Sequence, residues 1–275
     1  MRSLLKRHGL DPRKGLGQNF LVDHDALKRI AASAELTGAE TVLEIGAGLG
    51  SLTRLLAVSA RSVKAVEIDD RLVPILREVV SRFANVEVIQ GDILQLDPQQ
   101  MIGAPGYVIV GNIPYYITSA ITRHLLESPL KPSRMVLTMQ KEVAERICAE
   151  PGDLSLLALS VQVFGEPRIT TTIPAAAFYP EPAVDSATLR VDLYREPFFN
   201  PVQQKVFFDL IRMGFAQKRK MLRNTLAAGM RISSDDAAGL LQSAGINPER
   251  RAQTLNLVEW KTLVDVVQQR DGGKR

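Results

Sequence analysis

The sequence predicts an α/β protein whose doubly wound, mostly parallel sheet is followed by a small all-α domain. Short apolar segments alternate with amphipathic helical segments between residues 41 and 149, a glycine-rich loop follows the first apolar segment, and only helical patterns remain after residue 196. Such alternation implies right-handed crossovers and a parallel sheet with helices on both faces. Ligands of such sheets bind at the carboxyl ends of the strands, near the point where the strand order reverses.

The individual elements follow from local patterns in chain order. Asp23 can cap a helix over 24–34, whose apolar residues recur at helical spacing. Strands are expected over 41–45, 63–68, 86–90, 107–110 and 134–139, and helices over 52–59, 71–83, 119–126 and 141–149. A helix over 154–164, strands over 168–173 and 188–194, and helices over 201–216, 218–228, 234–243 and 257–268 complete the chain.

Length and composition fit two domains. We expect one over 1–195, which begins with a basic arm over 1–18, and a second over 196–275, with Glu196-Pro197 as the linker. A chain of 275 residues can bury a sizeable core in one large domain and a smaller one. The net charge of +4 is small, so the positions of the charges matter more than their sum.

Cysteine usage and hydropathy exclude several classes of protein. Cys148 is the only cysteine, which excludes an intramolecular disulfide and a multi-cysteine metal site and fits a reducing compartment. His24 stands between two aspartates, but the start of a surface helix explains this pattern better than a metal site does, and we expect no metal. Because no apolar run approaches the roughly 20 residues of a membrane span and the N-terminus lacks the apolar core of a signal peptide, we expect a cytoplasmic protein without a membrane partner.

Three successive strands are followed by residues suited to binding a nucleoside. Gly46, Gly48 and Gly50 form a G-x-G-x-G loop, which lets the backbone turn tightly and approach a ligand. Glu67 ends the next strand, about 20 residues further on, and is placed to accept from ribose hydroxyls. Asp92 follows the third strand and can accept from an adenine amino group. Each residue alone has a simpler explanation in packing, capping or a solvated turn, but their recurrence at strand ends favours a site.

The sequence Asn112-Ile113-Pro114-Tyr115 follows the fourth strand and suits chemistry on the amino group of a planar base. The Asn112 side chain and the Ile113 carbonyl could accept the two amino hydrogens and localise the nitrogen lone pair. Pro114 would fix the direction of that carbonyl, and the Tyr115 ring would offer a stacking face. The alternative is a turn at the end of a strand, with asparagine as its cap and proline as the breaker.

These motifs together resemble the S-adenosylmethionine-dependent methyltransferases with a Rossmann-like fold, in particular those that methylate exocyclic amino groups of bases. Three further segments are similar to the ribosomal RNA adenine dimethyltransferase family. They are Gly-Gln-Asn-Phe-Leu at 17–21, Phe-Tyr-Pro-Glu-Pro-Ala-Val-Asp-Ser at 178–186, and Phe-Ala-Gln-Lys-Arg-Lys-Met-Leu-Arg-Asn at 215–224. The basic arm and the last segment look like those of the bacterial small-subunit members.

The resemblance implies an S-adenosylmethionine-dependent enzyme that forms N6,N6-dimethyladenosine at two adjacent adenosines in the 3′-terminal hairpin of 16S rRNA. Its partner would be 16S rRNA within a precursor of the small ribosomal subunit, and we expect a monomer. Two alternatives remain open. One is a large-subunit rRNA adenine methyltransferase of the macrolide-resistance type, and the other is a non-enzymatic RNA-binding assembly factor on the same fold.

The resemblance also implies roles for individual residues. The cofactor-binding residues would be Asn19, Leu21, Gly46, Gly48, Glu67, Asp92 and Asn112. The catalytic set would be Asn112, Ile113, Pro114, Tyr115 and Phe178, with Tyr115 and Phe178 holding an extruded adenine between their rings. From the residues alone, Phe178 is more simply explained as a plug in the core.

Basic residues in the arm and in the segment after 216 suggest a surface that follows RNA phosphates. We expect RNA contacts from Arg13, Lys14, Lys218, Arg219, Lys220 and Arg223, although a solvated charged face is the alternative. Two departures from the family pattern stand out. Gly214 occupies a position where a small helix former such as alanine is expected, and 14–17 is more glycine-rich than usual, which predicts a more mobile arm.

Overall fold

A computed structural model of the chain describes residues 5, 7–113, 118–217 and 219–272. The chain divides into two compact units. The first comprises Met1–Glu145 and Gly165–Leu193, and the second comprises Arg146–Phe164 and Tyr194–Arg275. The predicted boundary near residue 195 lies close to the last of the three points, between residues 193 and 194, where the chain passes from one unit to the other. The segment 146–164, expected in the first domain, belongs to the second unit instead.

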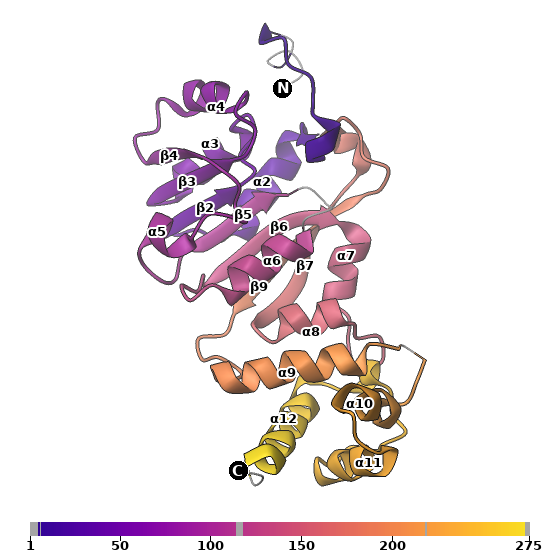
Figure 1. Cartoon of the computed structure of the whole chain (residues 1–275). Coiled ribbons are helices and arrows are strands. Elements are labelled where there is room, and N and C mark those ends of the chain that lie inside the picture. The colour runs from indigo at the N-terminus through magenta and orange to yellow at the C-terminus, as the bar shows by residue number, and fades with distance from the viewer. Residues whose placement is uncertain (1–4, 6, 114–117, 218, 273–275) are drawn as a thin grey trace. The chain divides into compact units, whose positions relative to one another are not determined.

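The first unit is built on a seven-stranded sheet (Figure 1). Its strands are β2 (Thr41–Ile45), β3 (Ser62–Glu67), β4 (Val86–Gln90), β5 (Val108–Asn112), β6 (Arg134–Gln140), β7 (Gly165–Ile173) and β9 (Ser186–Leu193). The spatial order is β4-β3-β2-β5-β6-β9-β7. The first five strands are parallel and β9 is antiparallel to both of its neighbours, which confirms the predicted mostly parallel sheet.

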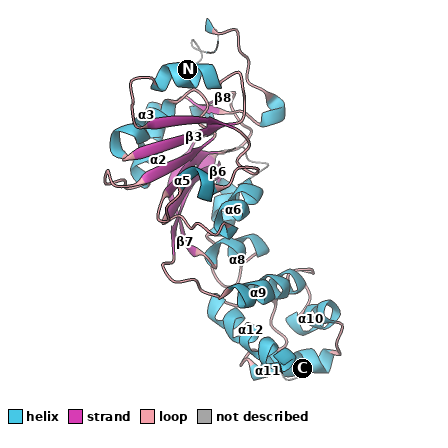
Figure 2. Cartoon of the chain, turned by 60° about the vertical axis from the view of Figure 1, so that its left-hand side comes forward, coloured by secondary structure: helices cyan, strands magenta, loops and turns pink. Residues whose placement is uncertain are grey.

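Helices cover both faces of this sheet, as expected for crossover connections. They are α2 (His24–Ser33), α3 (Ser51–Ser59), α4 (Val73–Val80), α5 (Pro98–Ile102), α6 (Thr118–Glu127) and α7 (Lys141–Ile147). Figure 2 shows α2 and α3 on one face and α5 and α6 on the other. The Asp23 carboxylate accepts from the amides of Asp25 and Ala26, so the predicted cap of α2 is confirmed. Helix α4 begins later than the predicted residue 71. Residues 71 and 72 belong to a turn in which the Leu72 amide donates to the Asp69 carbonyl.

The strand order reverses between β2 and β5, which both follow the pattern of a fully buried strand. Val42 and Leu43 of β2 have no exposed surface, and neither do Ile109 and Val110 of β5. Strands buried on both faces are read from sequence as continuous apolar runs, and these runs were therefore predictable. The reversal brings the loops after β2 and β5 together at one edge of the sheet.

A short two-stranded sheet holds the arm against the loop before β9. Strands β1 (Phe20–Leu21) and β8 (Phe178–Tyr179) pair antiparallel, with Phe20 opposite Tyr179 and Leu21 opposite Phe178. Two residues per strand are too few to give a periodic pattern, so the sequence did not predict this pairing. The pairing makes residues 20 and 21 a fixed part of the first unit.

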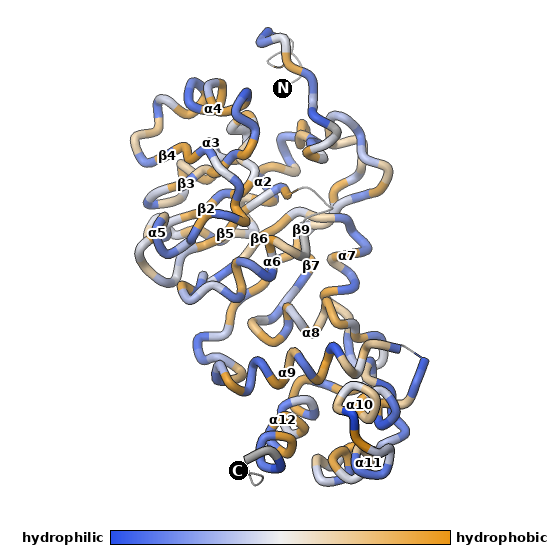
Figure 3. The backbone as a smooth tube through the Cα atoms, viewed as in Figure 1, coloured by the Kyte–Doolittle hydropathy of each residue, from blue (hydrophilic) through white to orange (hydrophobic). Residues whose placement is uncertain are grey.

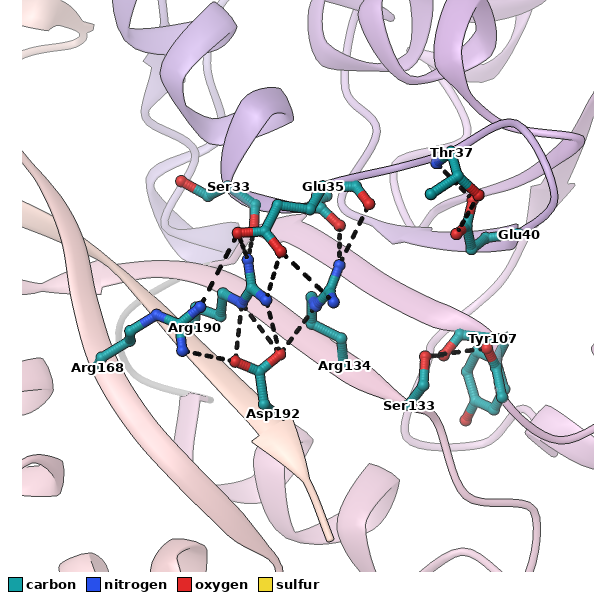
Figure 4. Close-up of polar contacts among 12 residues, drawn as sticks. Ser33, Glu35, Thr37, Glu40, Tyr107, Ser133, Arg134, Arg168, Arg190 and Asp192 are labelled. Carbon is teal, nitrogen blue, oxygen red and sulfur yellow. Dashed lines mark hydrogen bonds and ion pairs between the residues drawn. The ribbon is translucent and has the colours of Figure 1, made fainter. Parts of the chain in front are cut away.

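A cluster of charged residues fastens the end of α2 to the last strands of the sheet (Figure 4). Arg190 is only 4% exposed and donates to Glu35 at 2.8 Å and to Asp192 at 2.9 Å. Arg134 donates to Asp192 at 2.9 Å and also to the Ala34 carbonyl at the end of the helix. Burial would raise the pKa of Asp192, but the hydrogen bonds from both arginines outweigh it and lower that pKa. The cluster is therefore internally paired and structural.

The second unit is helical in the described residues. Its helices are α8 (Leu156–Gln162), α9 (Pro201–Gly214), α10 (Leu222–Met230), α11 (Ser234–Ser243) and α12 (Leu257–Gly272). Hydrophilic and hydrophobic residues alternate along α9 (Figure 3), and its apolar stripe packs in one core with residues of the other helices. Leu159 of α8 is fully buried in this same core, which explains why 146–164 belongs to this unit.

The start of α10 differs from the prediction. We expected a helix from residue 218, but α10 begins at Leu222, and Met221 before it is extended. Leu222 and Leu226 are fully buried, whereas the preceding charged residues have no apolar side chain to place against the core. Burial of an apolar face decides where a helix of this length begins, and charged residues with good helix propensity do not extend it.

Candidate active site

A cavity lies at the carboxyl ends of β2, β3, β4 and β5, where the strand order predicts a ligand site. Residues 16–20 form one wall, and the strand ends form the others. From here on, the arm includes the basic residues 1–18 and the two residues that follow them. Its lining residues are Leu16, Gly17, Gln18, Asn19, Phe20, Ile45, Gly46, Gly48, Val66, Glu67, Ile68, Leu72, Gly91, Asp92, Ile93, Asn112, Ile113 and Ile121. Six of the seven residues expected to bind cofactor are among them, and Leu21 is not.

The glycine loop after β2 requires glycine for two separate reasons. Gly46, Gly48 and Gly50 all have positive φ, at 72°, 57° and 76°. Residues that carry a Cβ rarely adopt this backbone conformation. A Cβ on Gly46 would also lie 3.3 Å from the Asn112 carbonyl oxygen, so the loop can approach β5 only without a side chain. The amides of Gly46 and Ala47 both donate to the Val66 carbonyl, at 3.0 and 3.1 Å, which fixes the loop against β3.

Glu67 presents a buried carboxylate at the end of β3. It is 4% exposed, and its two oxygens accept from the amides of Gly48 at 2.7 Å and Asp69 at 2.8 Å. Burial raises its pKa, and the two backbone hydrogen bonds oppose that shift. Each carboxylate oxygen has lone pairs left for a further donor, so the group is held in place and can still accept from a ligand hydroxyl.

Asp92 and Ile68 add a polar and an apolar side chain to the lining. Asp92 accepts from the Leu94 amide at 3.0 Å through one oxygen, which fixes the orientation of its carboxylate in the loop after β4. Ile68 is 49% exposed and lines the cavity beside Glu67. An exposed apolar side chain next to a carboxylate suits a ligand with a flat ring and hydroxyl groups.

Asn112 ends β5 and connects the sheet to the arm. Its Nδ2 donates to the backbone carbonyl of Asn19 at 3.2 Å, which fixes the orientation of the amide. Ile113 follows it in the lining and is 2% exposed. Pro114 and Tyr115 lie outside the described residues. The first two residues of the predicted catalytic sequence therefore stand at the cavity.

Leu21 and Phe178 lie behind the wall of the cavity. They are 3% and 1% exposed, and both belong to the main hydrophobic core of the first unit, together with Ile173 and Ala177. Neither contributes to the lining. Burial in this core is what the interpretation of Phe178 as a core plug expects, and Phe178 is not among the residues that line the cavity with Asn112.

Sequence reasoning missed a polar network beside the cavity. Asp69 has no exposed side-chain surface, and it accepts from Gln18 at 2.8 Å and from Arg71 at 2.7 and 3.0 Å. Arg13 lies 3.3 Å from the same carboxylate. Burial alone would raise the pKa of Asp69, but its hydrogen bonds from Arg71 and Gln18 lower it to about 2. The only sequence signal was an acid two residues after Glu67, which is indistinguishable from a turn residue.

Comparisons with known proteins agree with this geometry. The profile of the family Ribosomal RNA adenine dimethylase matches residues 9–263. The chain belongs to the ribosomal RNA adenine dimethylase family. A relative named Ribosomal RNA small subunit methyltransferase A from Dehalococcoides mccartyi strain CBDB1 is 44% identical over 263 residues, covering 95% of this chain and 90% of the relative. A relative of the same name from Pelotomaculum thermopropionicum is 40% identical, covering 96% and 94%.

Solved structures extend the comparison to the fold of this family member. The crystal structure of the 23S rRNA methyltransferase ErmE is 31% identical, with a TM-score of 0.73 over 91% of this chain and 100% of that chain. A dimethyladenosine transferase from Plasmodium falciparum has a TM-score of 0.80 at 24% identity, over 92% and 98% of the two chains. These likenesses confirm the predicted α/β methyltransferase fold with a helical C-terminal part. As a member of the dimethylase family, the chain is a methyltransferase.

The residues that we expect to bind RNA differ in their surroundings. Arg13 is paired with Asp69 and lies 3.7 Å from Asp70. Arg219 and Lys220 are exposed in the segment before α10, and Arg223 is half-buried in its first turn. Lys218 lies outside the described residues, and Lys14 begins a short 3-10 helix.

Gly214 departs from the family pattern for a reason that the structure supplies. A Cβ at this position would lie 2.9 Å from the Trp260 ring and 3.1 Å from Leu222. Trp260 is fully buried and its ring stacks near Phe215, with 6.5 Å between ring centres. The tryptophan fills the space that an alanine methyl would occupy, so the glycine is an adaptation of this core.

No described helix has the length and apolar character needed to cross a bilayer. Within the described ranges, no group of three or more histidine, cysteine, aspartate or glutamate side chains is arranged to hold a metal ion.

Proposed function

We propose that the chain transfers methyl groups from S-adenosylmethionine to the N6 amino groups of two adjacent adenosines in the 3′-terminal hairpin of 16S rRNA. The product is N6,N6-dimethyladenosine, formed in a precursor of the small ribosomal subunit. The observation that carries the proposal is the convergence of the glycine loop, Glu67, Asp92 and Asn112 on one cavity. The names of the relatives at 44% and 40% identity favour the small subunit as the substrate. We also propose that the enzyme acts in the cytoplasm as a monomer.

The lining residues fit S-adenosylmethionine. Glu67 is a fixed acceptor for the ribose hydroxyls, and Asp92 is placed to accept from the adenine amino group. The loop at Gly46 and Gly48 leaves room for the methionine part because neither residue carries a side chain. Asn112 at the end of β5 supplies a polar group, and so does Asn19 on the wall formed by the arm. Leu21 supports this wall from the core and does not line it.

The catalytic work of the chain is alignment and the localisation of a lone pair. The bound cofactor supplies a methyl group on a sulfonium ion, which departs as a neutral thioether. The Asn112 side chain and the Ile113 carbonyl accept the hydrogens of the adenine amino group, so that the nitrogen lone pair points at the methyl carbon. In this proposal Tyr115 would offer a stacking face to the extruded base, and Pro114 would restrict the backbone that carries the Ile113 carbonyl. The proton released after attack leaves to water, so a strong base is not required.

Admission of a monomethylated amine to the same pocket is required for the second transfer. The acceptor groups of Asn112 and Ile113 then hold one hydrogen in place of two, and cofactor exchange precedes the second step. Basic residues in the arm and before α10, including Lys220, bind phosphates of the folded RNA without reading bases. Recognition of the adenine itself is left to the cavity.

The experiment compares substrates directly. Purified small-subunit particles and deproteinised large-subunit RNA, both from cells that lack the modification, are incubated with the protein and labelled S-adenosylmethionine. We expect dimethyladenosine at two adjacent positions near the 3′ end of 16S rRNA, mapped by mass spectrometry of nuclease fragments, and no label in large-subunit RNA.

Two other results would contradict the proposal. Label confined to large-subunit RNA would assign the macrolide-resistance activity, which the likeness to ErmE at 31% identity makes the second candidate. Tight binding to the particle without methyl transfer would assign a non-enzymatic assembly factor. A variant with Asn112→Ala serves as the inactive control, because it keeps the other lining residues.

A further inference from the structure

A buried carboxylate outside the proposed catalytic set ties the arm to the cavity. Asp69 stands two residues after Glu67 and has no exposed side-chain surface. Within its own loop, it is held by the Arg71 guanidinium through two hydrogen bonds and by the Arg71 amide at 3.2 Å. From the arm it receives a hydrogen bond from Gln18 and the charge of Arg13. It is therefore a point where two walls of the cavity meet.

Gln18 transmits this anchor to the backbone of the arm. Its amide nitrogen donates to Asp69 at 2.8 Å, and its amide oxygen accepts from the backbone nitrogen of Arg13 at 2.7 Å. The side chain thus bridges Asp69 and the turn that begins the arm wall. The segment 16–20 that follows lines the cavity, and the neighbouring Phe20 ring packs in a cluster with Leu49 and Leu72.

A hydrogen bond joins this wall to Asn112 at the end of β5. The backbone carbonyl of Asn19 accepts from Asn112 Nδ2 at 3.2 Å. Because the nitrogen of the amide is held by the arm, its oxygen is turned the other way, which is the orientation required of an acceptor for a substrate amine. Displacement of the arm would remove this partner and leave the Asn112 amide free to rotate.

We propose that Asp69 is a positioning residue that holds the arm closed, so that enclosure of the cofactor and orientation of the Asn112 amide occur together. The inference rests on the cofactor site and on the Asn112 role proposed above. A buried anion needs hydrogen-bond donors, and the arm supplies a neutral donor and a cation where water would otherwise stand. Closure is therefore controlled by the Asp69 carboxylate and by the donors that face it from positions 13 and 18.

The test introduces a second carboxylate against the first. Gln18→Glu removes the donor to Asp69 and places two anions within hydrogen-bonding distance, which opens the arm. In the absence of ligand, we expect trypsin to cut after Arg13 or Lys14 about tenfold faster than in the wild-type protein, and we expect the Kd of S-adenosylhomocysteine to rise about tenfold. At saturating cofactor, kcat also falls, because Asn112 loses its orienting partner.

Rescue separates a positioning role from general damage. Combining Gln18→Glu with Asp69→Asn restores a donor and an acceptor with their sense reversed, since the new amide at position 69 donates to the new carboxylate at position 18. The amide keeps an oxygen for the Arg71 amide nitrogen, so the local turn is retained. We expect the double variant to recover cleavage rate, Kd and kcat to within about threefold of wild type.

Asp70→Asn is the matched control. Asp70 is adjacent, its side chain is 65% exposed, and its only salt bridge among the described residues is with Arg13 at 3.7 Å, so this change leaves all three readouts unaltered. The proposal would be overturned if Gln18→Glu were cleaved at the wild-type rate and bound S-adenosylhomocysteine with the wild-type Kd. It would also be overturned if the losses in the double variant were the sum of those measured in Gln18→Glu alone and in Asp69→Asn alone. Because cleavage is measured without ligand, it tests the arm even if the protein binds no cofactor. A wild-type protein that failed to bind S-adenosylhomocysteine would instead overturn the proposed function.

Discussion

The two units place the residues that we propose to be functional in different ways. In the first unit, Gly46, Glu67, Asp92 and Asn112 come from separate strands, and the parallel topology brings them to one cavity. In the second unit, the basic residues follow one another along the chain between α9 and α10, where Arg219 and Lys220 are exposed to solvent. The first site is made by topology and depends on positions within a fraction of an ångström. The second depends on the amount of charge.

This difference predicts how each unit responds to single substitutions. Changes at the cavity should have large effects that are not compensated by neighbours, because each residue has a distinct task. Changes on the basic surface should be small and roughly additive, because phosphate contacts act as independent charges.

Asn112→Ala carries the largest expected effect. Loss of the acceptor should lower kcat by about a thousandfold, since the substrate amine is no longer aligned, while the Kd of S-adenosylhomocysteine stays within a few-fold. Single-turnover kinetics and calorimetric binding measure the two separately. Equal losses in turnover and in cofactor affinity would show that Asn112 serves only to bind cofactor.

Glu44 tests the electrostatics beneath the cavity. It is 1% exposed in β2, and burial raises its pKa to about 8. A carboxyl with a raised pKa binds a proton in the folded state that the unfolded state has lost. Its contribution to stability is therefore complete below pH 4.5, its ordinary pKa, and is lost as the pH rises to about 8.

Glu44→Gln should remove this pH dependence. Between pH 5 and pH 8, we expect the free energy of unfolding of the wild-type protein to fall by about 3 kcal/mol more than that of the variant. Urea unfolding at both pH values measures the difference. Identical pH profiles for the two proteins would mean that Glu44 is ionised in the folded state.

Gly46→Ala should weaken cofactor binding about thirtyfold, because a methyl group at positive φ is strained and also approaches the Asn112 carbonyl. Gly38→Ala is the matched control. Gly38 has a φ of 94° and no atom within 4 Å of an added Cβ, so it shares the strain without touching the cavity. The interpretation is wrong if both variants bind cofactor equally well.

Gly214→Ala should destabilise the core of the second unit by about 1–2 kcal/mol, because the Trp260 ring must shift and the better helix propensity of alanine offsets only part of that cost. Gly239→Ala, in α11, has open space around the added Cβ and should be neutral or slightly stabilising. Thermal unfolding monitored by tryptophan fluorescence compares them. Equal melting temperatures would remove the steric explanation for Gly214.

Lys220→Ala carries the smallest expected effect. Binding to small-subunit particles should weaken only a few-fold, and the slope of log K against log salt should fall by about one, as for the loss of one phosphate contact. Filter binding at several salt concentrations measures the slope. An unchanged slope would mean that Lys220 belongs to a solvated face, and a loss comparable with that of Asn112→Ala would erase the contrast between the two units.

The sequence was informative where burial and motif agreed. The parallel strands are short, mostly apolar segments that alternate with helices, and polar or glycine residues suited to a nucleoside follow them, so the fold and most of the cavity lining were predictable. The start of α10 was not, because its charged residues have good helix propensity but nothing to bury. The network at Asp69 was also hidden, since Gln18 and Asp69 are 51 residues apart and only the folded chain brings them together.

The central claim is that one cavity aligns a substrate amine with the methyl group of the cofactor through Asn112. A crystal structure of the protein with S-adenosylhomocysteine tests it most directly. We expect the ribose hydroxyls on Glu67, the adenine amino group near Asp92, and the Asn112 amide held by the Asn19 carbonyl beside the sulfur. A ligand bound elsewhere, or an Asn112 side chain turned away from the sulfur, would contradict the account.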